Sequence, residues 1–512
     1  MTDTNQTVAN REALEEMVAE ADTGARKPLG KTKHVIFVVA LGWALFQLWY
    51  ASPLPYILNF GVIPDGQARV IHLCFAFLLA FTTFPAFKTS RRDAVPLYDW
   101  VLAVLAIGST AYLLVFYKDI SLRPGLPTTP DIVVSVIGVV LLLEAARRAV
   151  GPALAIIAAI MLIYIFTGPY LPGLMGHKGA SLGRAASQMW LTSEGIFGVA
   201  LGVSTNVVFF FVLFGSLLEK AGAGNYFIQI AFAMLGTFRG GPAKAGVVAS
   251  GMTGMISGSS IANTVTTGTF TIPLMKRVGY SAVKAGAIEC AAGVNGQLMP
   301  PVMGAAAFLI AEYVGIPYAD VVKHAFLPAF LTYGALFYIV DIEAAKAGML
   351  GLPRAVSTPF RYSLVRGLMT LCGIIVLSGI VYYGVGWIKT VFGDAASWVL
   401  GTALIVIYVG LLRQKAKHPD LAIDDVTKKI VKVPDFYETA RTGLHYLLPV
   451  VVLIWCLMIE ELSPGLSAFW GTMFLIFIMV TQRPLIGFFR GDTAYGTRIR
   501  EGMDDLIASF QG

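Results

Sequence analysis

The sequence predicts an all-α polytopic membrane protein, and three observations support this class. Of the 512 residues, 56% are hydrophobic and only 13% are charged, whereas soluble globular domains carry about 25% charged residues. Apolar runs of about 20 residues, the length that crosses a bilayer as a helix, recur along the whole chain. The net charge of +7 comes from Lys and Arg gathered in particular loops, where they set orientation in the lipid bilayer and do not indicate nucleic-acid binding.

Twelve transmembrane spans are predicted in chain order. They lie near residues 35–52, 69–87, 100–117, 131–145, 152–170, 196–218, 281–313, 324–341, 366–386, 394–412, 444–460 and 465–481. The segment from Tyr226 to Gly236 is too short to cross, so we expect it at the interface or packed as an arm. The polar stretch over residues 1–33 has no apolar signal-peptide core and is expected to be a cytosolic N-terminal segment.

The basic loops predict the orientation of the spans. With a cytosolic N-terminus, the Lys- and Arg-rich segments all face the cytosol, and the opposite loops hold only one or two basic residues each. The cytosolic segments are 88–92, 144–148, 219–244, 341–366, 413–443 and the C-terminal tail 482–512. This distribution follows the excess of positive charge in cytoplasmic loops.

One polar stretch, "ISGSSIANTVTTGTFTIP" over residues 256–273, predicts a re-entrant hairpin. Nine of its eighteen side chains are Ser, Thr or Asn and none is charged. The apolar segment around it has basic residues at both ends, which both favour the cytosol. We therefore expect a hairpin over 243–276, with arms of roughly 22 Å that enter a bilayer core of about 30 Å without crossing it.

The tip of this hairpin is a candidate binding site. Backbone groups at such a turn must face protein or water, and the ends of half-helices at the midplane hold ions and anionic substrates in secondary transporters. Gly258 allows the turn, and the candidate ligands are Ser257, Ser259, Ser260, Asn263 and Thr264. The alternative is that the hydroxyls bond to carbonyls one turn back or pack between helices.

A second irregular element, "GVNGQLMPP", interrupts the next span. Pro300 and Pro301 lack the N–H groups that would bond one turn back, so nearby carbonyls are free. Together with Asn295, Gly296 and Gln297 they would suit a hard cation. The alternative is a kink that only shapes packing.

Glu289 lies before this break, and a carboxylate inside the membrane is a candidate coupling acid. The alternative is a structural ion pair with Lys284 or Lys244. Asp341 and Glu343, at the cytosolic end of a later span, are expected to be solvated.

The sequence contains none of the catalytic or nucleotide-binding motifs GxxxxGK[ST], HExxH or GxSxG. We therefore predict that the chain is not an enzyme and needs no cofactor. Without a nucleotide-binding loop, transport by this chain would draw on an ion gradient. Glu144 with Arg147 and Arg148 has the spacing of an ion-paired group on a helix surface.

Three segments carry a resemblance to a known family: "EKAGAG", "RGGPAKAGVVASGMTGMISGSSIANTVTTGTFTIPLMKRVGYSAVKAGAIE" and "GQLMPPVMGAAAFLIAEYVGIPY". They resemble the large permease of tripartite ATP-independent periplasmic (TRAP) transporters, in the branch where small and large permeases are fused. The resemblance implies a small-subunit-like membrane region over 34–175, a large-permease-like region over 176–481 and a cytosolic amphipathic segment over 482–512.

The resemblance also implies a function. It implies an elevator-type importer in the bacterial inner membrane, coupled to Na⁺, to which a periplasmic substrate-binding protein delivers an organic anion such as a carboxylate. Ser257, Ser259, Ser260 and Asn263 match the family's first hairpin tip, and Gly296, Gln297, Pro300 and Pro301 match its partner helix. Na⁺ is expected at Ser259, Asn263 and Asn295.

Two departures from the family pattern change these expectations. Gly293-Val294 stands where relatives in this branch carry small hydroxyl residues, so backbone ligation is expected there. No second "SGSS"-like or "LPT"-like element occurs in 330–512, so half of the family's site is expected to come from a second permease polypeptide, or from a continuation of the chain of which this sequence is a fragment. The alternative is a truncated, inactive or scaffold membrane subunit, and a passive channel is the third reading.

Overall fold

The computed structural model describes residues 25–510 apart from 27, 88, 301–303, most of 354–382, 420–432 and 492–494. Across this part of the chain the fold is helical, and nine helices are long and apolar enough to cross a membrane. They confirm nine of the predicted spans. The expected N-terminal segment 1–33 falls mostly outside the described residues, as does the span predicted over 366–386.

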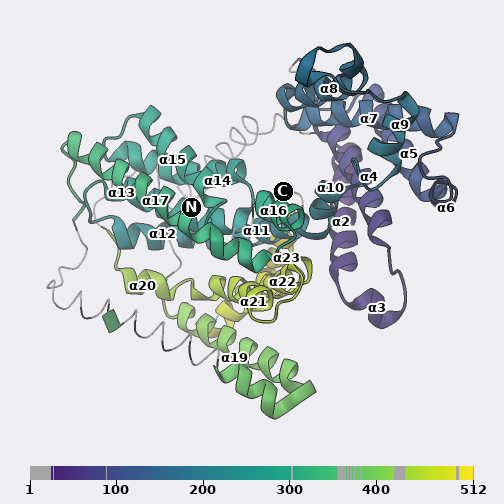
Figure 1. Cartoon of the computed structure of the whole chain (residues 1–512). Helices are drawn as coiled ribbons and strands as arrows, with labels where there is room; N and C mark the ends of the chain where they lie inside the picture. Colours follow the sequence, from purple (N-terminus) through teal and green to yellow (C-terminus); the bar gives the residue numbers. More distant parts are fainter. Residues whose placement is uncertain are drawn as a thin grey trace.

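The first lobe, at the upper right of Figure 1, is built by the N-terminal helices. These are α2 (Lys31–Ala51), α3 (Leu54–Leu58), α4 (Asp65–Thr83), α5 (Leu97–Val115), α6 (Tyr117–Ser121), α7 (Thr129–Ala149), α8 (Pro152–Thr167) and α9 (Leu182–Ala186), followed by a π-helical turn, η3 (Ser187–Leu191). Helices α4, α5 and α7 pack together around Phe77, Phe81 and Trp190. Gly138 of α7 makes room for this indole, because a β-carbon there would lie 2.2 Å from Trp190.

A buried ion network closes one end of this lobe. Glu144 pairs with Arg147 and Arg148 at the predicted spacing. Arg148 also pairs with Asp99 at 2.6 Å, and Asp99 pairs with Arg26 at 2.5 Å. The network is therefore larger than the expected surface group, and it fastens the chain before α2 to α5 and α7.

The middle of the chain forms a second lobe, at the left of Figure 1. The span Val199–Lys220 leads into it as α10 (Val199–Val203), a π-helical turn η4 (Ser204–Val208) and α11 (Phe209–Lys220). The short arm expected near Tyr226 is α12 (Ala223–Leu235), which packs on α13 (Gly241–Ser257). Then follow α14 (Ser260–Arg277), α15 (Ala282–Gly296), α16 (Ala305–Val314) and α17 (Tyr318–Lys346). The span predicted over 281–313 is thus divided into the two short helices α15 and α16.

The remaining helices lie below the second lobe in Figure 1. They are α19 (Ala396–Ala416), α20 (Phe436–Arg441), α21 (Leu448–Met458), α22 (Pro464–Arg490) and α23 (Tyr495–Ser509). The span predicted over 444–460 is a shorter apolar segment, Leu444–Met458. Within the C-terminal segment expected to be amphipathic, α23 is held on α22 by the pairs of Arg483 with Glu501 and Asp505.

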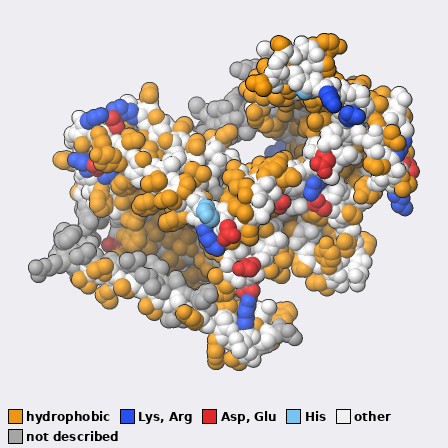
Figure 2. Space-filling model, in the orientation of Figure 1, with side chains coloured by type: hydrophobic (Ala, Val, Ile, Leu, Met, Phe, Trp, Pro, Cys, Tyr) orange, Lys and Arg blue, Asp and Glu red, His pale blue; other side chains and the backbone are white. Residues whose placement is uncertain are grey.

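The outer surface is that of a membrane protein. Figure 2 shows hydrophobic side chains spread over both lobes, with charged side chains in small separate groups. Helix α8 exposes most of its apolar side chains, including Leu154, Ile156, Ile157 and Ile160. Lipid tails solvate such side chains, so the apolar exposure and the nine long helices together identify a multi-pass membrane protein.

Candidate ion and substrate site

The predicted hairpin tip is a turn between two antiparallel-packed helices, α13 and α14. Gly258 ends α13 with φ 66°, in the left-handed region that glycine adopts without a steric penalty. Ser259 immediately precedes α14, and its carbonyl accepts from the N–H of Asn263 at 3.0 Å, which is the first hydrogen bond of that helix. The last carbonyls of α13 and the first N–H groups of α14 therefore meet at one place, where neither set has intrahelical partners.

The predicted break after α15 lies against this tip. Helix α15 ends at Gly296, and the side-chain Nε2 of Gln297 donates to the carbonyl of Gly258 at 3.3 Å. The two discontinuities that were identified in the sequence are therefore in direct contact. The carbonyls expected to be free at this break are bonded: those of Val294, Asn295 and Gly296 accept from the N–H groups three residues further on, in tight turns.

Glycines allow α13, α14 and α15 to approach this closely. A β-carbon on Gly296 would lie 2.8 Å from the Cα of Gly254, and one on Gly293 would lie 2.0 Å from Oγ1 of Thr264. Small residues at helix interfaces let backbones pack in this way inside membranes. The hydroxyl expected from relatives at Gly293 would have no room here.

Asn263 is buried, with 1% of its surface exposed, between α13 and α15. Its Nδ2 donates to the carbonyl of Ser250 at 3.0 Å and to the Ser250 hydroxyl at 3.2 Å. Its Oδ1 is buried and has no hydrogen-bond partner among the described residues. A buried acceptor without a partner carries a desolvation cost, which an oxygen-seeking cation would remove.

Glu289 is fully buried where α15 meets α14. Its two carboxylate oxygens accept from the hydroxyls of Thr267 and Thr271. Hydroxyl donors thus solvate the carboxylate inside the helix bundle.

The ion-pair alternative for Glu289 is wrong in this structure. Lys244 pairs with Asp341 at 2.6 Å, and Lys284 pairs with Glu343. Asp341 and Glu343, expected to be simply solvated, are corrected to partners that fasten α17 to the start of α13 and of α15. The reason is that α17 packs along both helices, which brings its C-terminal carboxylates to their basic ends.

The other predicted site residues take the following places. Ser259, Ser260 and Thr264 are half-buried at the start of α14, and Asn295, Gln297 and Pro300 are half-buried at the end of α15. Pro301 and the side chain of Ser257 lie outside the described residues. The sequence reasoning missed Ser250, Thr267 and Thr271, although Asn263, Thr267 and Thr271 recur every four residues and so line one face of α14.

Tyr333 of α17 contacts both α15, near the end of that helix, and α13. Its hydroxyl donates to the carbonyl of Ala292 at 3.0 Å, one turn before the end of α15, and its ring lies against Gly251 of α13. The last carbonyls of a helix lack intrahelical N–H donors, and the Tyr333 hydroxyl supplies a donor to one of them.

Replacing Tyr333 with Phe is expected to lower the free energy of unfolding by about 1 kcal/mol, because the Ala292 carbonyl loses its donor. Tyr338→Phe is the matched control on the same helix, since Tyr338 is exposed and its loss should change little. Thermal midpoints of the two purified variants in detergent check this. Equal midpoints would contradict the role given to Tyr333.

The atoms near the tip that could ligate a cation are neutral oxygens. Among the described residues, no three His, Cys, Asp or Glu side chains gather as a cluster that could hold a transition metal. Neutral amide, hydroxyl and carbonyl oxygens are hard ligands and fit a hard cation better than a soft metal.

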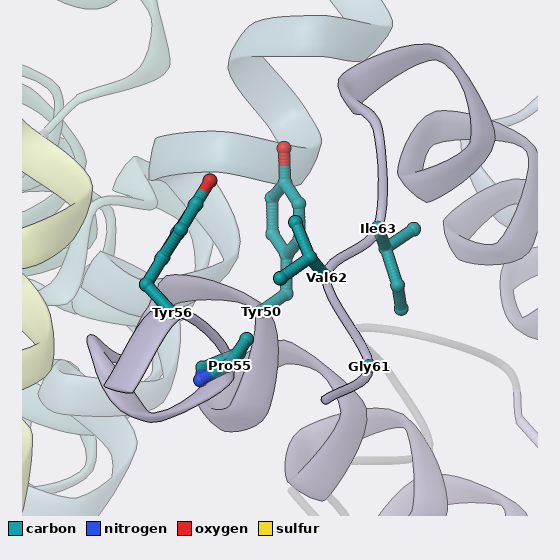
Figure 3. Close-up of a pocket in the computed structure, with 6 residues that line it drawn as sticks. All are labelled: Tyr50, Pro55, Tyr56, Gly61, Val62 and Ile63. Carbon is teal, nitrogen blue, oxygen red and sulfur yellow. The ribbon is translucent and has the colours of Figure 1, made fainter. Parts of the chain in front are cut away.

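A shallow pocket in the first lobe is separate from this site. Figure 3 shows Tyr50 and Tyr56 with their hydroxyls on one side, beside Pro55 and the loop through Gly61, Val62 and Ile63. Its lining contains no charged side chain. It therefore offers no counter-charge for an anionic substrate, and the hairpin tip remains the better candidate.

Comparison with known proteins identifies a family. Residues 137–433, more than half of the chain, match the family described as "Tripartite ATP-independent periplasmic transporter, DctM component".

Three relatives illustrate the range of similarity. The C4-dicarboxylate TRAP transporter large permease protein DctM of Vibrio cholerae is 36% identical over 25% of this chain and 27% of its own length. The protein of the same name from Rhodobacter capsulatus is 27% identical over 53% of this chain and 62% of its own length. The 2,3-diketo-L-gulonate TRAP transporter large permease protein YiaN of Escherichia coli is 21% identical over 32% of this chain and 38% of its own length.

The chain thus spans less than two thirds of the length of these curated relatives. The family match nevertheless covers the span η4–α11, the hairpin α13–α14, the broken helix α15–α16 and α17 together. The chain belongs to the DctM, or large permease, family of tripartite ATP-independent periplasmic transporters.

Proposed function

We propose that this chain is the permease component of a TRAP-type secondary transporter that imports an organic anion, a carboxylate, with an ion gradient. The coupling ion is Na⁺, and a periplasmic substrate-binding protein delivers the substrate. The permease lies in the bacterial inner membrane with both termini cytosolic, an orientation supported by the basic segments on one side of the predicted spans.

One observation carries the proposal: the contact between the hairpin tip and the end of α15. Gln297 reaches the carbonyl of Gly258, and the buried Oδ1 of Asn263 lies in the same three-helix unit. Two helix breaks in contact, with a buried amide oxygen that has no partner among the described residues, resemble the discontinuous helices that bind cations and carboxylates in secondary transporters. The names of the relatives, which specify C4-dicarboxylate and 2,3-diketo-L-gulonate transport, support an anionic substrate.

The site residues of this proposal are those at the two breaks. Na⁺ binds at Ser259, Asn263 and Asn295, with the substrate beside the tip residues and Gln297, and Glu289 acts as the coupling acid. The fused small-subunit-like region supports the hairpin lobe, which moves as an elevator.

Uptake measurements test this function. Cells that express the chain with its genomic neighbours should accumulate a radiolabelled C4-dicarboxylate, such as succinate, when Na⁺ is present outside. Asn263→Ala should reduce the initial rate of uptake at least about tenfold. The variant loses one ligand to the cation, and a loss of about 1.4 kcal/mol in binding free energy weakens affinity tenfold. The matched control is Asn225→Ala, at a half-buried position in α12, which should transport like the wild type.

Other outcomes would contradict the proposal in distinct ways. An uptake rate that does not depend on external Na⁺ would contradict Na⁺ as the coupling ion. A chain that is folded and produced with its partners, yet transports none of a panel of mono- and dicarboxylates, would favour the scaffold alternative.

A further inference from the structure

One face of helix α4 is polar and lies against the start of the span Val199–Lys220, where the two lobes join. Asp65, Arg69 and His72 follow one another at spacings of four and three residues, so they share one side of the helix. Each of them bonds to the chain between residues 197 and 206. Helices in lipid are not driven together by the hydrophobic effect, so hydrogen bonds of this kind help to hold them in place.

The direction of the His72 hydrogen bond follows from Trp43 of α2. The indole Nε1 of Trp43 lies 3.1 Å from Nδ1 of His72, and an indole N–H can only donate. Nδ1 therefore accepts, which places the proton of the neutral imidazole on Nε2. Nε2 is then the donor to Oγ of Ser204, 3.2 Å away. Because His72 is only 4% exposed, this hydrogen bond lies inside the joint between the lobes.

Asp65 and Arg69 bind the same segment nearer the start of α4. Asp65 pairs with Arg69 and accepts from Nδ2 of Asn206 at 2.9 Å. Nη1 of Arg69 donates to two consecutive carbonyls just before α10, at 2.8 and 3.0 Å. Gly202 leaves room for the guanidinium, because a β-carbon there would lie 2.7 Å from Cζ of Arg69. Helix α4 thus binds both backbone and side chains of this segment.

The two side chains that α4 binds, Ser204 and Asn206, both belong to the π-helical turn η4. A π-helical turn holds one residue more than an α-helical turn, and it occurs mostly as a single turn inside an α-helix. On the other side of the turn, the Asn206 carbonyl lies against Gly465 of α22, where a β-carbon would come within 2.3 Å of its oxygen. The additional residue is therefore accommodated between α4 and α22.

The helix that follows the turn is fixed by other contacts. The large side chains of α11 that are fully buried in the core of the second lobe are Phe210, Phe211, Phe214, Leu217 and Leu218. Phe211 packs on Phe308 of α16, with ring centroids 4.9 Å apart, while Val212 is 44% exposed. An α-helix turns by about 100° per residue, so the gain or loss of one residue within α11 would rotate these side chains out of the core.

We propose that the polar face of α4 is the surface by which the first lobe binds the π-helical turn η4, and that this turn is a one-residue adaptor between two fixed helices. On one side, His72 and Asp65 hold the turn on the first lobe. On the other side, the core holds α11 in the second lobe. The additional residue takes up the difference in register between them. The inference requires neither the ion nor the substrate proposed above.

Single-residue deletions test the adaptor in the full-length chain purified in detergent. Deleting Asn206 should convert η4 into an ordinary α-helical turn while α10 and α11 keep their register. We expect folded protein, with a thermal midpoint close to that of Asn206→Ala, which loses the same side chain. Deleting Val212, an exposed residue in the regular part of α11, is the matched control. It must rotate one part of α11 against the other by about 100°, so the midpoint should fall far lower or no folded protein should be recovered.

A second measurement tests the interaction surface. His72→Ala and Ser204→Ala should each lower the thermal midpoint. The double variant should melt at the midpoint of His72→Ala, because both substitutions remove the same hydrogen bond and coupled sites are not additive. His324→Ala is the control, since His324 is exposed on α17 and its Nδ1 contacts a carbonyl of its own helix. Its midpoint should equal that of the wild type.

Each measurement has a result that overturns the inference. If the deletion of Asn206 lowers the midpoint as far as the deletion of Val212, or gives no folded protein where Asn206→Ala does, the turn is not a one-residue adaptor. If the effects of His72→Ala and Ser204→Ala add in full, α4 does not hold the turn through this hydrogen bond. Should His72→Ala not fold, the combination of Asp65→Ala with Asn206→Ala decides by the same criterion.

Discussion

Replacing Gly296 with alanine is expected to destabilise the protein by about 3 kcal/mol and to abolish any Na⁺ response. The added β-carbon would lie 2.8 Å from the Cα of Gly254 and 3.1 Å from Nδ2 of Asn263. Backbone cannot rotate away as a side chain can, so α13 and α15 must separate, and overpacking of this kind costs about 1–3 kcal/mol or more. The separation would also pull Gln297 away from Gly258.

Gly286→Ala is the matched control for this prediction. Gly286 lies in the same helix, α15, and a β-carbon there would meet nothing within 4 Å. Alanine has a higher helix propensity than glycine by about 1 kcal/mol, so this variant should be as stable as the wild type or slightly more so. Thermal midpoints in detergent measure both. The thermal midpoint should fall for Gly296→Ala and stay the same or rise slightly for Gly286→Ala. A fall of similar size in both variants would refute the close contact between Gly296 and Gly254.

Replacing Asp99 with alanine is expected to cost about 3 kcal/mol of stability. Asp99 and Arg26 have fully buried side chains, and Arg148 is only 2% exposed. Removing one partner of a buried ion pair leaves an uncompensated charge, at a cost of about 3–5 kcal/mol. The lower end applies because Glu144 still accepts from Arg148 at 2.8 Å, so only Arg26 loses its counter-ion.

Asp93→Ala is the control for the ion network. Asp93 pairs with Arg91 on the surface, where the two side chains are 55% and 77% exposed, and such pairs contribute about 1 kcal/mol or less. The thermal midpoint should fall clearly for Asp99→Ala and hardly for Asp93→Ala. Similar midpoints in the two variants would show that the buried network does not hold the first lobe together.

Comparison of the sequence predictions with the structure shows which signals are local. The hairpin was predicted from its glycines, hydroxyls and basic flanks, and the turn lies at Gly258. The break in the next span was predicted from Gly296 and the Pro-Pro pair, and α15 ends at Gly296. Both depend on backbone preferences and solvation of a few neighbouring residues, which is why a single sequence reveals them.

The partners of the charged residues could not be predicted in the same way. Asp99 lies 73 residues from Arg26 and 49 from Arg148, and Asp341 lies 97 residues from Lys244. Sequence spacing contains no information about such contacts, so Asp341 and Glu343 were expected to be solvated and Glu289 was given the wrong ion-pair alternative. Of the Glu144 group, only the pairs within one helix turn were predictable.

The sequence by itself determined the membrane class, the position of nine long apolar helices, and the two places where helices break. These properties follow from hydropathy and from the conformational limits of glycine and proline, which act over less than about 20 residues. Only the tertiary structure decided that the two breaks touch, that Asn263 donates to Ser250, and that the Oδ1 of Asn263 is left without a partner among the described residues. Those relations depend on how α13, α14 and α15 pack, and packing joins residues whose separation along the chain has no bearing on their distance in space.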